Sequence, residues 1–470
     1  MIMYRIENDL IGDLEVPFNA YYGIQTQRAV NNFHITGIKL SQYPELIKAL
    51  AYVKWAAAKT NFELGILDET ITNAIIKACQ EIITGKFNKE FPSDIIQGGA
   101  GTSTNMNINE VVANIALEIM GHKKGEYNFC SPHDHVNLSQ STNDAYPTSI
   151  KLAAINSNKI LIEHLKMLID SFRKKGKEFM YVLKMGRTQL QDAVPMTLGQ
   201  EFEAFAETLS EDVDRLIQNS NLFLEINMGA TAIGTGLNAI SGYAELCAGN
   251  LAEITGHPFI SAKNLVEATP DTGSYVIYSS ALKRVAIKLS KICNDLRLLS
   301  SGPRCGLNEI NLPALQPGSS IMPGKVNPVI PEAMNQTCFK VIGNDLTVTL
   351  AAESGQLQLN VMEPVIAYSL LESVHILMNA MDCLRVNCVD GITANEQHCK
   401  EMVLNSIGIV TALNPYIGYK NSTKIAKEAL EKNRSVYELV LEHNLLSKEK
   451  LDEILNPENM LGPHKYYNKD

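Results

Sequence analysis

One stretch of the chain combines hydroxyl groups, a cation and an amide within a segment that cannot be regular secondary structure. Residues 318–328 read Gly-Ser-Ser-Ile-Met-Pro-Gly-Lys-Val-Asn-Pro. Prolines and glycines at this density exclude a helix interior or a central strand. Ser319, Ser320, Lys325 and Asn327 are therefore expected on a loop that presents hydroxyls, backbone N–H groups, one positive charge and one amide. This set of groups suits a small anionic ligand.

Three other segments place polar side chains just before a helical pattern. They are centred on Thr102, on Ser141-Thr142-Asn143, and on Thr188-Gln189. A hydroxyl at the start of a helix is by default an N-cap. The alternative is that the free N–H groups and the partial positive charge of the helix N-terminus receive a carboxylate. If the three segments converge with the 318–328 loop they form an anion cradle, and local sequence leaves that convergence open.

The 318–328 loop resembles, over its full length, the signature loop of the fumarase/aspartase superfamily, whose members reversibly eliminate ammonia, water or an amine-bearing group to leave fumarate. Residues 21–28, Tyr-Tyr-Gly-Ile-Gln-Thr-Gln-Arg, and residues 229–238 resemble the aspartase branch. The resemblance covers essentially the whole chain from Arg5. It implies a mostly α-helical fold, with a long central helical bundle and smaller N- and C-terminal domains, in a homotetramer.

The chemistry of such an elimination defines what the site must contain. A proton is removed from the carbon beside a carboxylate, and the carbanion is stable only if its charge spreads onto that carboxylate as a dianionic aci form. The site therefore needs donors around the β-carboxylate, an anchor for the α-carboxylate and a base near the β-carbon. If enough donors converge, neither a metal nor an organic cofactor is required, and we expect none.

The resemblance assigns these roles to particular residues. Ser319 would be the base, acting as an alkoxide or near-alkoxide, although an isolated Gly-Ser-Ser is more often a turn. The donors to the β-carboxylate of the substrate would be Thr102, Ser141, Thr142 and the Ser320 backbone. Asn143 would contact the leaving amine. The α-carboxylate would be bound by Lys325, Asn327, Thr188 and Gln189. Active sites of this family are assembled from three subunits, so these residues would not all come from one chain.

Gln189 bears on which reaction is catalysed. Fumarases typically carry histidine here, and so do some aspartases. Expelling hydroxide calls for a proton donor, whereas an ammonium group leaves already protonated. Glutamine cannot act as an acid. The resemblance therefore implies reversible deamination of L-aspartate to fumarate and ammonia. A fumarate hydratase and a non-catalytic structural or binding relative remain alternatives, and cleavage of argininosuccinate or adenylosuccinate is disfavoured because no arginine-rich segment suits a bulkier adduct.

Composition limits the class of protein and its surroundings. The chain has 470 residues, of which 45% are apolar and 20% charged, with a net charge of −10. This acidity argues against binding to nucleic acid or to an acidic membrane. The nine cysteines are scattered, and the N-terminus shows no secretory signal. We therefore expect a cytoplasmic protein with free thiols. His133 and His135 are two residues apart on a loop, which is weak support for a metal site.

Hydrophobic periodicity predicts the elements that must position these residues. Helical patterns cover residues 44–64, 68–83, 148–182, 195–226, 275–300, 328–354 and 361–388, and another begins after Thr102. Pro147 and Pro195 are expected in first helical turns. No strand series alternates with the helices, so a βαβ sheet is unsupported and the glycines at 234 and 236 are not a dinucleotide motif. The predicted domains are residues 1–141, 142–396 and 397–470.

Overall fold

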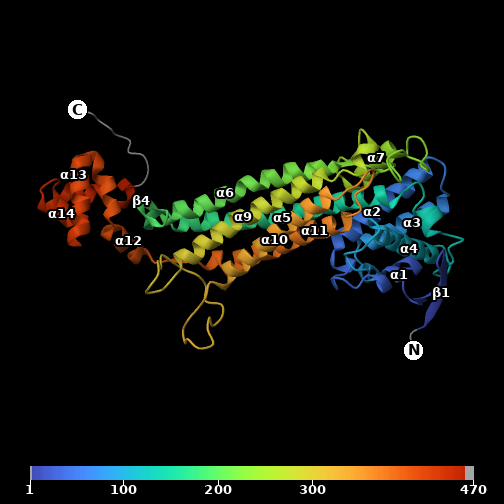
Figure 1. Ribbon diagram of the computed structural model, residues 1–470, viewed down its shortest axis with the longest axis horizontal. Coiled ribbons are helices and arrows are strands. Elements are labelled where there is room, and N and C mark those ends of the chain that lie inside the picture. The colour runs from blue at the N-terminus through green and yellow to red at the C-terminus, as the bar shows by residue number, and fades with distance from the viewer. Residues whose placement is uncertain (1–2, 461–470) are drawn as a thin grey trace. The chain divides into compact units, whose positions relative to one another are not determined.

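The structure, a computed structural model that describes residues 3–460, is mostly α-helical (Figure 1). The helices are α1 (Ile24–Asn32), α2 (Pro44–Glu63), α3 (Glu69–Ile83), α4 (Thr102–Ile119), α5 (Thr142–Glu178), α6 (Leu198–Ser220), α7 (Tyr243–Thr255), α8 (Leu265–Ala268), α9 (Gly273–Leu299), α10 (Val329–Glu353), α11 (Glu363–Asn387), α12 (Glu396–Asn405), α13 (Val410–Lys432), α14 (Val436–Glu442), α15 (Lys448–Ile454) and α16 (Pro457–Met460). The predicted fold class is confirmed.

The strands are short and pair only in twos within the described residues. They are β1 (Tyr4–Asp9) with β2 (Gly12–Pro17), β3 (Leu183–Thr188) with β4 (Gln191–Thr197), β5 (Glu225–Ile226) with β6 (Ile260–Ser261), and β7 (Ile310–Asn311) with β8 (Thr393–Ala394). Within residues 3–460 we find no helix whose length and hydropathy would let it span a lipid bilayer.

The chain forms two compact units. Unit 1 comprises Met1–Ile162, Asp214–Ala286 and Phe339–Leu377, and unit 2 comprises Glu163–Val213, Ile287–Cys338 and Met378–Asp470. The long helices α5, α6, α9, α10 and α11 contribute residues to both units. The domain boundaries at residues 141 and 396 remain a prediction.

In unit 1 the long helices are joined by buried polar contacts as well as by apolar packing. Tyr278 Oη of α9 donates to Asn158 Oδ1 of α5 at 3.0 Å, and Ser279 Oγ donates to Asp345 Oδ1 of α10 at 2.9 Å. All four groups are buried and hydrogen bonded. These contacts therefore fix the lengthwise register of the helices as well as their association.

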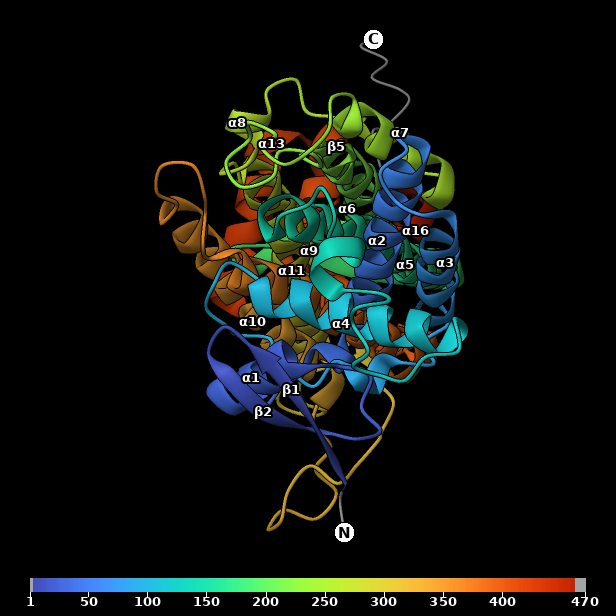
Figure 2. The same ribbon diagram turned by 90° about the vertical axis from the view of Figure 1, so that its right-hand side faces the viewer.

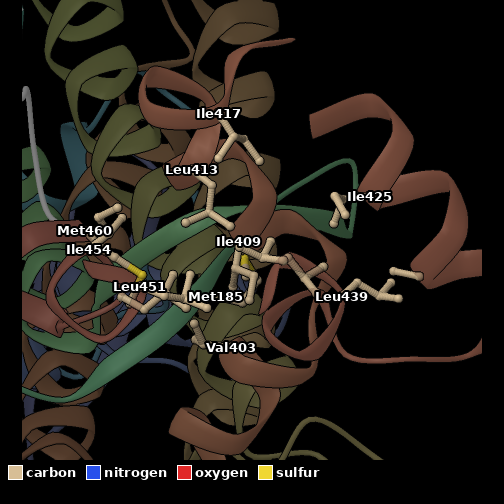
Figure 3. Packing of buried hydrophobic residues seen from close by; sticks show 14 of the residues in the cluster. Met185, Val403, Ile409, Leu413, Ile417, Ile425, Leu439, Leu451, Ile454 and Met460 are labelled. Atoms are coloured by element: carbon tan, nitrogen blue, oxygen red, sulfur yellow. The ribbon is translucent and has the colours of Figure 1, made fainter. Parts of the chain in front are cut away.

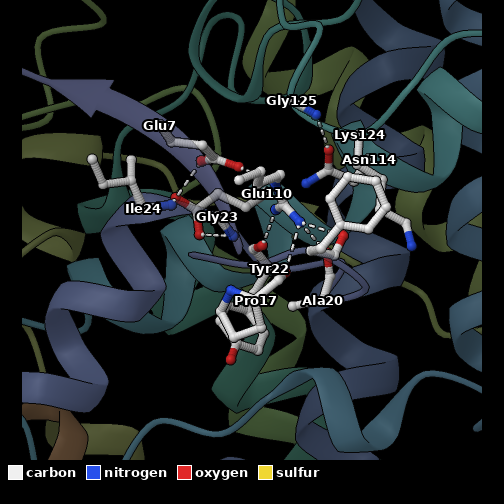
Figure 4. A network of polar contacts seen from close by, with 12 residues as sticks. Glu7, Pro17, Ala20, Tyr22, Gly23, Ile24, Glu110, Asn114, Lys124 and Gly125 are labelled. Carbon is white, nitrogen blue, oxygen red and sulfur yellow. Dashed lines mark hydrogen bonds and ion pairs between the residues drawn. The ribbon is translucent and has the colours of Figure 1, made fainter. Parts of the chain in front are cut away.

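The N-terminal hairpin and α1 lie against α4 in the same unit (Figure 2). Figure 4 shows the polar contacts that hold them: Glu110 Oε2 of α4 accepts the N–H of Gly23 at 2.8 Å, and Glu7 Oε2 accepts the N–H of Ile24 at 2.9 Å. A carboxylate at the N-terminus of α1 is favourable because the first N–H groups of a helix have no internal partner. Burial raises the pKa of Glu110 to about 7, although the Thr26 hydroxyl and the N–H groups of Gln25 and Gly23, which donate to it, act in the opposite direction.

In unit 2 the β3–β4 hairpin is part of a C-terminal apolar core. Met185 of β3 packs in one buried cluster with Val403, Ile409, Leu413 and further residues of α12 to α15 (Figure 3). The aromatic rings of Phe172 and Phe202 join α5 to α6 with their centroids 6.1 Å apart. The hairpin is thus anchored on a packed core rather than carried on a free loop.

The hairpin corrects one prediction. Pro195 was expected in the first turn of a helix, but it lies within β4, and α6 begins only at Leu198. Gln189 and Leu190 both have positive φ, 52° and 61°, and they form the two-residue turn between paired Thr188 and Gln191. Such turns need positive φ at both central positions, which glycine and asparagine usually supply. Neither residue is present at positions 189 and 190, so local sequence does not identify this two-residue turn.

The periodicity of apolar residues predicted the bounds of five helices closely. Helices α2, α3, α9, α10 and α11 match the predicted ranges to within two residues at each end. Pro147 lies in the sixth position of α5 rather than in its first turn. A proline there leaves the carbonyl four residues earlier without its helical partner. The side chain of Asn227 replaces that partner, since its Nδ2 donates to the Asn143 carbonyl at 3.0 Å.

Candidate active site

The first predicted hydroxyl segment starts helix α4 in unit 1. Gly101, at φ 91°, is the N-cap residue, and a Cβ built there would lie 2.3 Å from a ring carbon of Tyr146. Thr102 is exposed, and its Oγ1 donates to a carbonyl of the preceding turn at 2.7 Å. The N–H of Thr104 is capped by Gln97 Oε1 at 3.0 Å. The default expectation that Thr102 caps this helix is therefore wrong.

The second segment starts helix α5 with a reciprocal cap. Ser141 Oγ accepts the N–H of Asn143 at 3.2 Å, and Asp144 Oδ1 accepts the N–H of Ser141 at 2.9 Å. This pair is a capping box with aspartate as its acidic partner. Thr142 is buried and Asn143 is half-buried, so the cap holds both side chains in defined positions.

The starts of α4 and α5 lie side by side. Asn105, one turn into α4, donates from Nδ2 to Thr142 Oγ1 at 3.3 Å, and the Tyr146 ring of α5 packs on Gly101. The structure therefore brings the segments of Thr102 and Thr142 together in unit 1.

A buried lysine lies beneath these two helix starts. Lys54 of α2 donates from Nζ to Asn105 Oδ1 at 2.7 Å, to Gln140 Oε1 at 2.9 Å and to Asn137 Oδ1 at 3.2 Å. Burial lowers the pKa of Lys54 to about 7, and burial raises the pKa of Asp144 to about 7, while each of the two groups partly offsets the shift of the other. Three amide oxygens satisfy the lysine without a direct ion pair.

The amide of Asn143 has only one possible orientation. Its Nδ2 donates to the Ala232 carbonyl at 2.8 Å, and a carbonyl can only accept a hydrogen bond. The Oδ1 atom therefore points away from that contact. No hydrogen bond to Oδ1 is found among residues 3–460, so it is available as an acceptor.

The third predicted segment lies in unit 2, at the tip of the β3–β4 hairpin. Thr188 and Gln189 are both exposed. Arg187, immediately before them, donates from Nη1 to Glu309 Oε1 at 2.6 Å, and Lys184 Nζ lies 2.9 Å from Glu309 Oε2. Lys184 also pairs with Glu201 at the start of α6. These two cations and two carboxylates are largely buried and balance in charge.

Glu309 connects this hairpin to the loop that carries Ser319. Its backbone donates to the Leu299 carbonyl at 2.8 Å and accepts from the Asn395 N–H at 2.9 Å, and β7 begins at the next residue. Its side chain is 1% exposed. The same residue thus holds strand β3 of the hairpin and directly precedes β7, after which the long loop begins.

The predicted signature loop is irregular, as expected, and it is closed on itself. The N–H of Gly318 donates to the Lys325 carbonyl at 2.7 Å, and Asn327 Nδ2 donates to the Gly318 carbonyl at 2.7 Å. Residues of the segment 314–326 line a hollow of about 450 Å³ that includes Ser319 and Lys325. Ser320 and Lys325 are exposed, whereas Ser319 and Asn327 are half-buried.

Ser319 Oγ receives two backbone N–H groups, from Met322 at 3.0 Å and from Ile321 at 3.2 Å. A neutral hydroxyl in a turn can accept such bonds, but the same donors stabilise an oxygen that carries negative charge. The loop therefore supplies part of what a serine base requires.

The structure gathers the ten predicted site residues into three groups. The first group lies in unit 1 and comprises Thr102, Ser141, Thr142 and Asn143. The other two lie in unit 2: Thr188 with Gln189 at the hairpin, and Ser319, Ser320, Lys325 and Asn327 on the loop. The predicted roles of these residues remain predictions.

Several residues that hold the site were not predicted. Lys54, Asn105, Asp144 and Glu309 act beneath the surface, and only Asp144 had a local signal, because Ser-Thr-Asn-Asp fits a capping box. The other three are recognisable only once distant segments are brought together.

His133 and His135 lie on one short helical turn. Residues Pro132–Val136 form a single π-helical turn, in which His135 Nδ1 accepts the N–H of Ser131 at 2.9 Å. Among residues 3–460 no group of three or more His, Cys, Asp or Glu side chains could hold a metal ion.

Comparison with known proteins identifies the family. Residues 12–343 match the family described as Lyase, and residues 409–462 match the one described as Fumarase C C-terminus. The chain is 63% identical over 460 residues to an aspartate ammonia-lyase of Pseudomonas aeruginosa, and 60% identical over 462 residues to one of Helicobacter pylori. These alignments cover 98% of this chain in both cases, and 97% and 99% of the two relatives.

Solved structures of related proteins have the same fold. A fumarate lyase:delta crystallin from Brucella melitensis, bound to cobalt, superposes with a TM-score of 0.95 at 53% identity and covers 98% of this chain and 100% of its own. The class II fumarase of Schistosoma mansoni gives a TM-score of 0.91 at 38% identity, with 97% and 99% coverage. From the matched residues and the shared fold, the chain belongs to the lyase family that includes aspartate ammonia-lyases and class II fumarases.

Proposed function

We propose that this protein is an aspartate ammonia-lyase, a carbon–nitrogen lyase that reversibly converts L-aspartate to fumarate and ammonia. Support comes from relatives of that name at 57–63% identity over nearly the whole chain. The observation that carries the reaction type is the pair of backbone N–H groups on Ser319 Oγ. They supply part of the anion stabilisation that a serine base needs.

The mechanism follows from these groups. Ser319, as an alkoxide, takes a proton from the β-carbon of L-aspartate, and the electron pair of that C–H bond moves into the β-carboxylate. Donors at the starts of α4 and α5, from Thr102, Ser141 and Thr142, stabilise the resulting dianion. The pair then returns to form the carbon–carbon double bond, the C–N bond breaks, and its electrons leave with ammonia.

The choice of an amine as leaving group rests on Asn143 and Gln189. An ammonium group can only donate hydrogen bonds, and the free Oδ1 of Asn143 can only accept them. Gln189 could hydrogen bond to the α-carboxylate, together with Thr188, Lys325 and Asn327, but it cannot protonate a departing hydroxide. This argues against fumarate hydration. Hydration is nevertheless the second candidate function, because the chain shares its fold with a fumarase.

The test is the ultraviolet absorbance of fumarate after the purified protein is mixed with L-aspartate or with L-malate. We expect turnover of aspartate only. Turnover of malate alone would replace the proposed function by the second candidate, and turnover of neither would leave a non-catalytic relative.

We also propose a homotetramer whose active sites combine residues from different subunits. Phe339, Leu346 and Leu350 on α10 are 61%, 60% and 59% exposed. Their spacing puts them on one face of the helix. An apolar face of this kind on a long helix is suited to packing against another copy. The nine free cysteines, most of them buried, agree with a reducing compartment such as the cytoplasm.

A further inference from the structure

One segment of the chain contacts the start of α5 and has no role in the mechanism above. This is the 227–232 segment, Asn-Met-Gly-Ala-Thr-Ala, which overlaps the 229–238 stretch that resembles the aspartase branch. Residues 227–231 are buried, and Ala232 is exposed.

The backbone of this segment is held in an unusual conformation. Thr231 has φ 58°, a value that is rare for a β-branched residue. Its N–H donates to Asp144 Oδ2 at 2.9 Å, and the N–H of Gly229 donates to the same oxygen at 3.2 Å. Backbone strain of this kind persists where surrounding contacts impose it, and it is common at functional sites.

Asp144 therefore serves two structures at once. Its Oδ1 completes the capping box with Ser141, while its Oδ2 holds the 227–232 segment. The carboxylate is fully buried and all of these partners are backbone N–H groups. An amide side chain of the same size could not accept from both directions.

The segment in turn fixes Asn143 from two sides. The Ala232 carbonyl accepts from the Asn143 side chain at 2.8 Å, and Asn227 Nδ2 donates to the Asn143 carbonyl at 3.0 Å. Without the Ala232 carbonyl, the Asn143 amide could rotate and present its NH₂ group instead of Oδ1. An NH₂ group would repel an ammonium group rather than bind it.

From these contacts we infer that Asp144 is a positioning residue for the leaving amine: through the 227–232 segment it holds the Asn143 amide with Oδ1 facing the substrate. The inference rests on the proposed function, because it needs an amine as leaving group.

The experiment measures the reverse reaction, in which ammonium and fumarate are varied separately. We expect Asp144→Asn to raise the KM for ammonium about tenfold, the effect of one lost hydrogen bond, while the KM for fumarate stays within about twofold. Asn227→Ala should also raise the KM for ammonium selectively, but by a smaller factor. If Asp144→Asn does not fold, the Asn227→Ala variant tests the inference in its place.

Asp94→Asn is the matched control. Asp94 is also a buried carboxylate of unit 1 that accepts backbone N–H groups, from Thr36 at 2.8 Å and Ile96 at 2.9 Å, but it has no contact with Asn143. This variant should lower the melting temperature and leave the ratio of the two KM values unchanged.

Equal changes in both KM values for Asp144→Asn, or no change in either, would overturn the inference. If the wild-type protein makes no fumarate from L-aspartate, the proposed function fails instead, so the two failures are distinguishable.

Discussion

At the scale of single residues, the main requirement is that Ser319 ionise. At neutral pH an ordinary serine hydroxyl is almost wholly protonated, so a serine base works only where its anion is stabilised. The N–H groups of Ile321 and Met322 provide two donors to Oγ. Because the bonds run from backbone to side chain within the loop, they depend on loop conformation and survive most side-chain substitutions nearby.

Ser319→Ala tests this role. We expect kcat to fall by about 10²–10⁴-fold, the usual contribution of a general base, with the oligomer intact. Steady-state rates with L-aspartate and light scattering check the two parts. Ser320→Ala is the control, since only the backbone of Ser320 is proposed to contribute and its side chain is exposed. Retention of wild-type kcat in Ser319→Ala would remove Ser319 as the base.

At the scale of elements, the position of each active group depends on the buried contacts that hold its loop or helix. The tip of the β3–β4 hairpin is exposed, but strand β3 carries Lys184 and Arg187, which are paired with the buried Glu309. A balanced set of buried charges contributes little net stability, although removing one member is costly because it leaves the others unpaired.

Glu309→Gln should accordingly destabilise the protein by about 3–5 kcal/mol and speed amide hydrogen exchange in both the hairpin turn and the 312–327 loop. Denaturant unfolding and exchange mass spectrometry measure these effects. Glu453→Gln, which removes the exposed partner of Lys450, should change stability by less than about 0.5 kcal/mol. Faster exchange in the hairpin alone would mean that Glu309 does not connect it to the loop.

At the scale of the whole molecule, buried ionisable groups link stability to pH. Glu363, the first residue of α11, is 1% exposed, and its Oε2 has no hydrogen-bond partner among the described residues. Burial raises the pKa of Glu363 from 4.5 to about 8, with Lys151 opposing the shift. Tyr146 and Tyr275, also buried, are the other titratable groups that interact with it.

Because the pKa of Glu363 is raised in the folded protein, this group makes the protein less stable as the pH rises. Below pH 4.5 the carboxyl is protonated in both folded and unfolded chains, so its contribution to stability is fully present. As the pH rises toward 8 the unfolded chain loses the proton first, and stability falls by on the order of 4 kcal/mol.

Glu363→Gln removes this dependence. We expect the variant to gain stability over the wild type between pH 5 and about 8, measured as the difference in unfolding free energy at each pH. Glu267→Gln, at an exposed position in the same unit, should show no such trend. A difference that shrinks as the pH rises would mean that Glu363 is ionised in the folded protein, held by Lys151.

The proposed tetramer makes a separate prediction. Leu346→Asp puts a charge in the middle of the exposed apolar face of α10 and should dissociate the assembly, since an unpaired charge is costly at an apolar interface. Light scattering and circular dichroism should reveal folded subunits of lower mass and little activity. Leu237→Asp, also at a strongly exposed leucine but on a loop, should leave the assembly intact. Full activity in dissociated Leu346→Asp subunits would argue against shared active sites.

Local patterns in the sequence determined much of this protein. Periodic apolar residues specified the long helices, because burial of one face imposes a period of 3.6 residues whatever the helix packs against. Prolines and glycines specified the 318–328 loop, and Ser141 with Asp144 specified the cap of α5. The turn at Gln189–Leu190 was missed because positive φ at two ordinary residues is imposed by the hairpin core and not by their own preferences.

Only the tertiary structure decided how the active groups are held. Glu309 lies more than a hundred residues from the arginine it pairs with, and the Ala232 carbonyl that orients Asn143 lies 89 residues away along the chain. No local sequence pattern predicts either contact, because the two partners come together only when distant segments pack against each other. The sequence therefore specifies which groups can react, and the packing of distant segments specifies where each of them points.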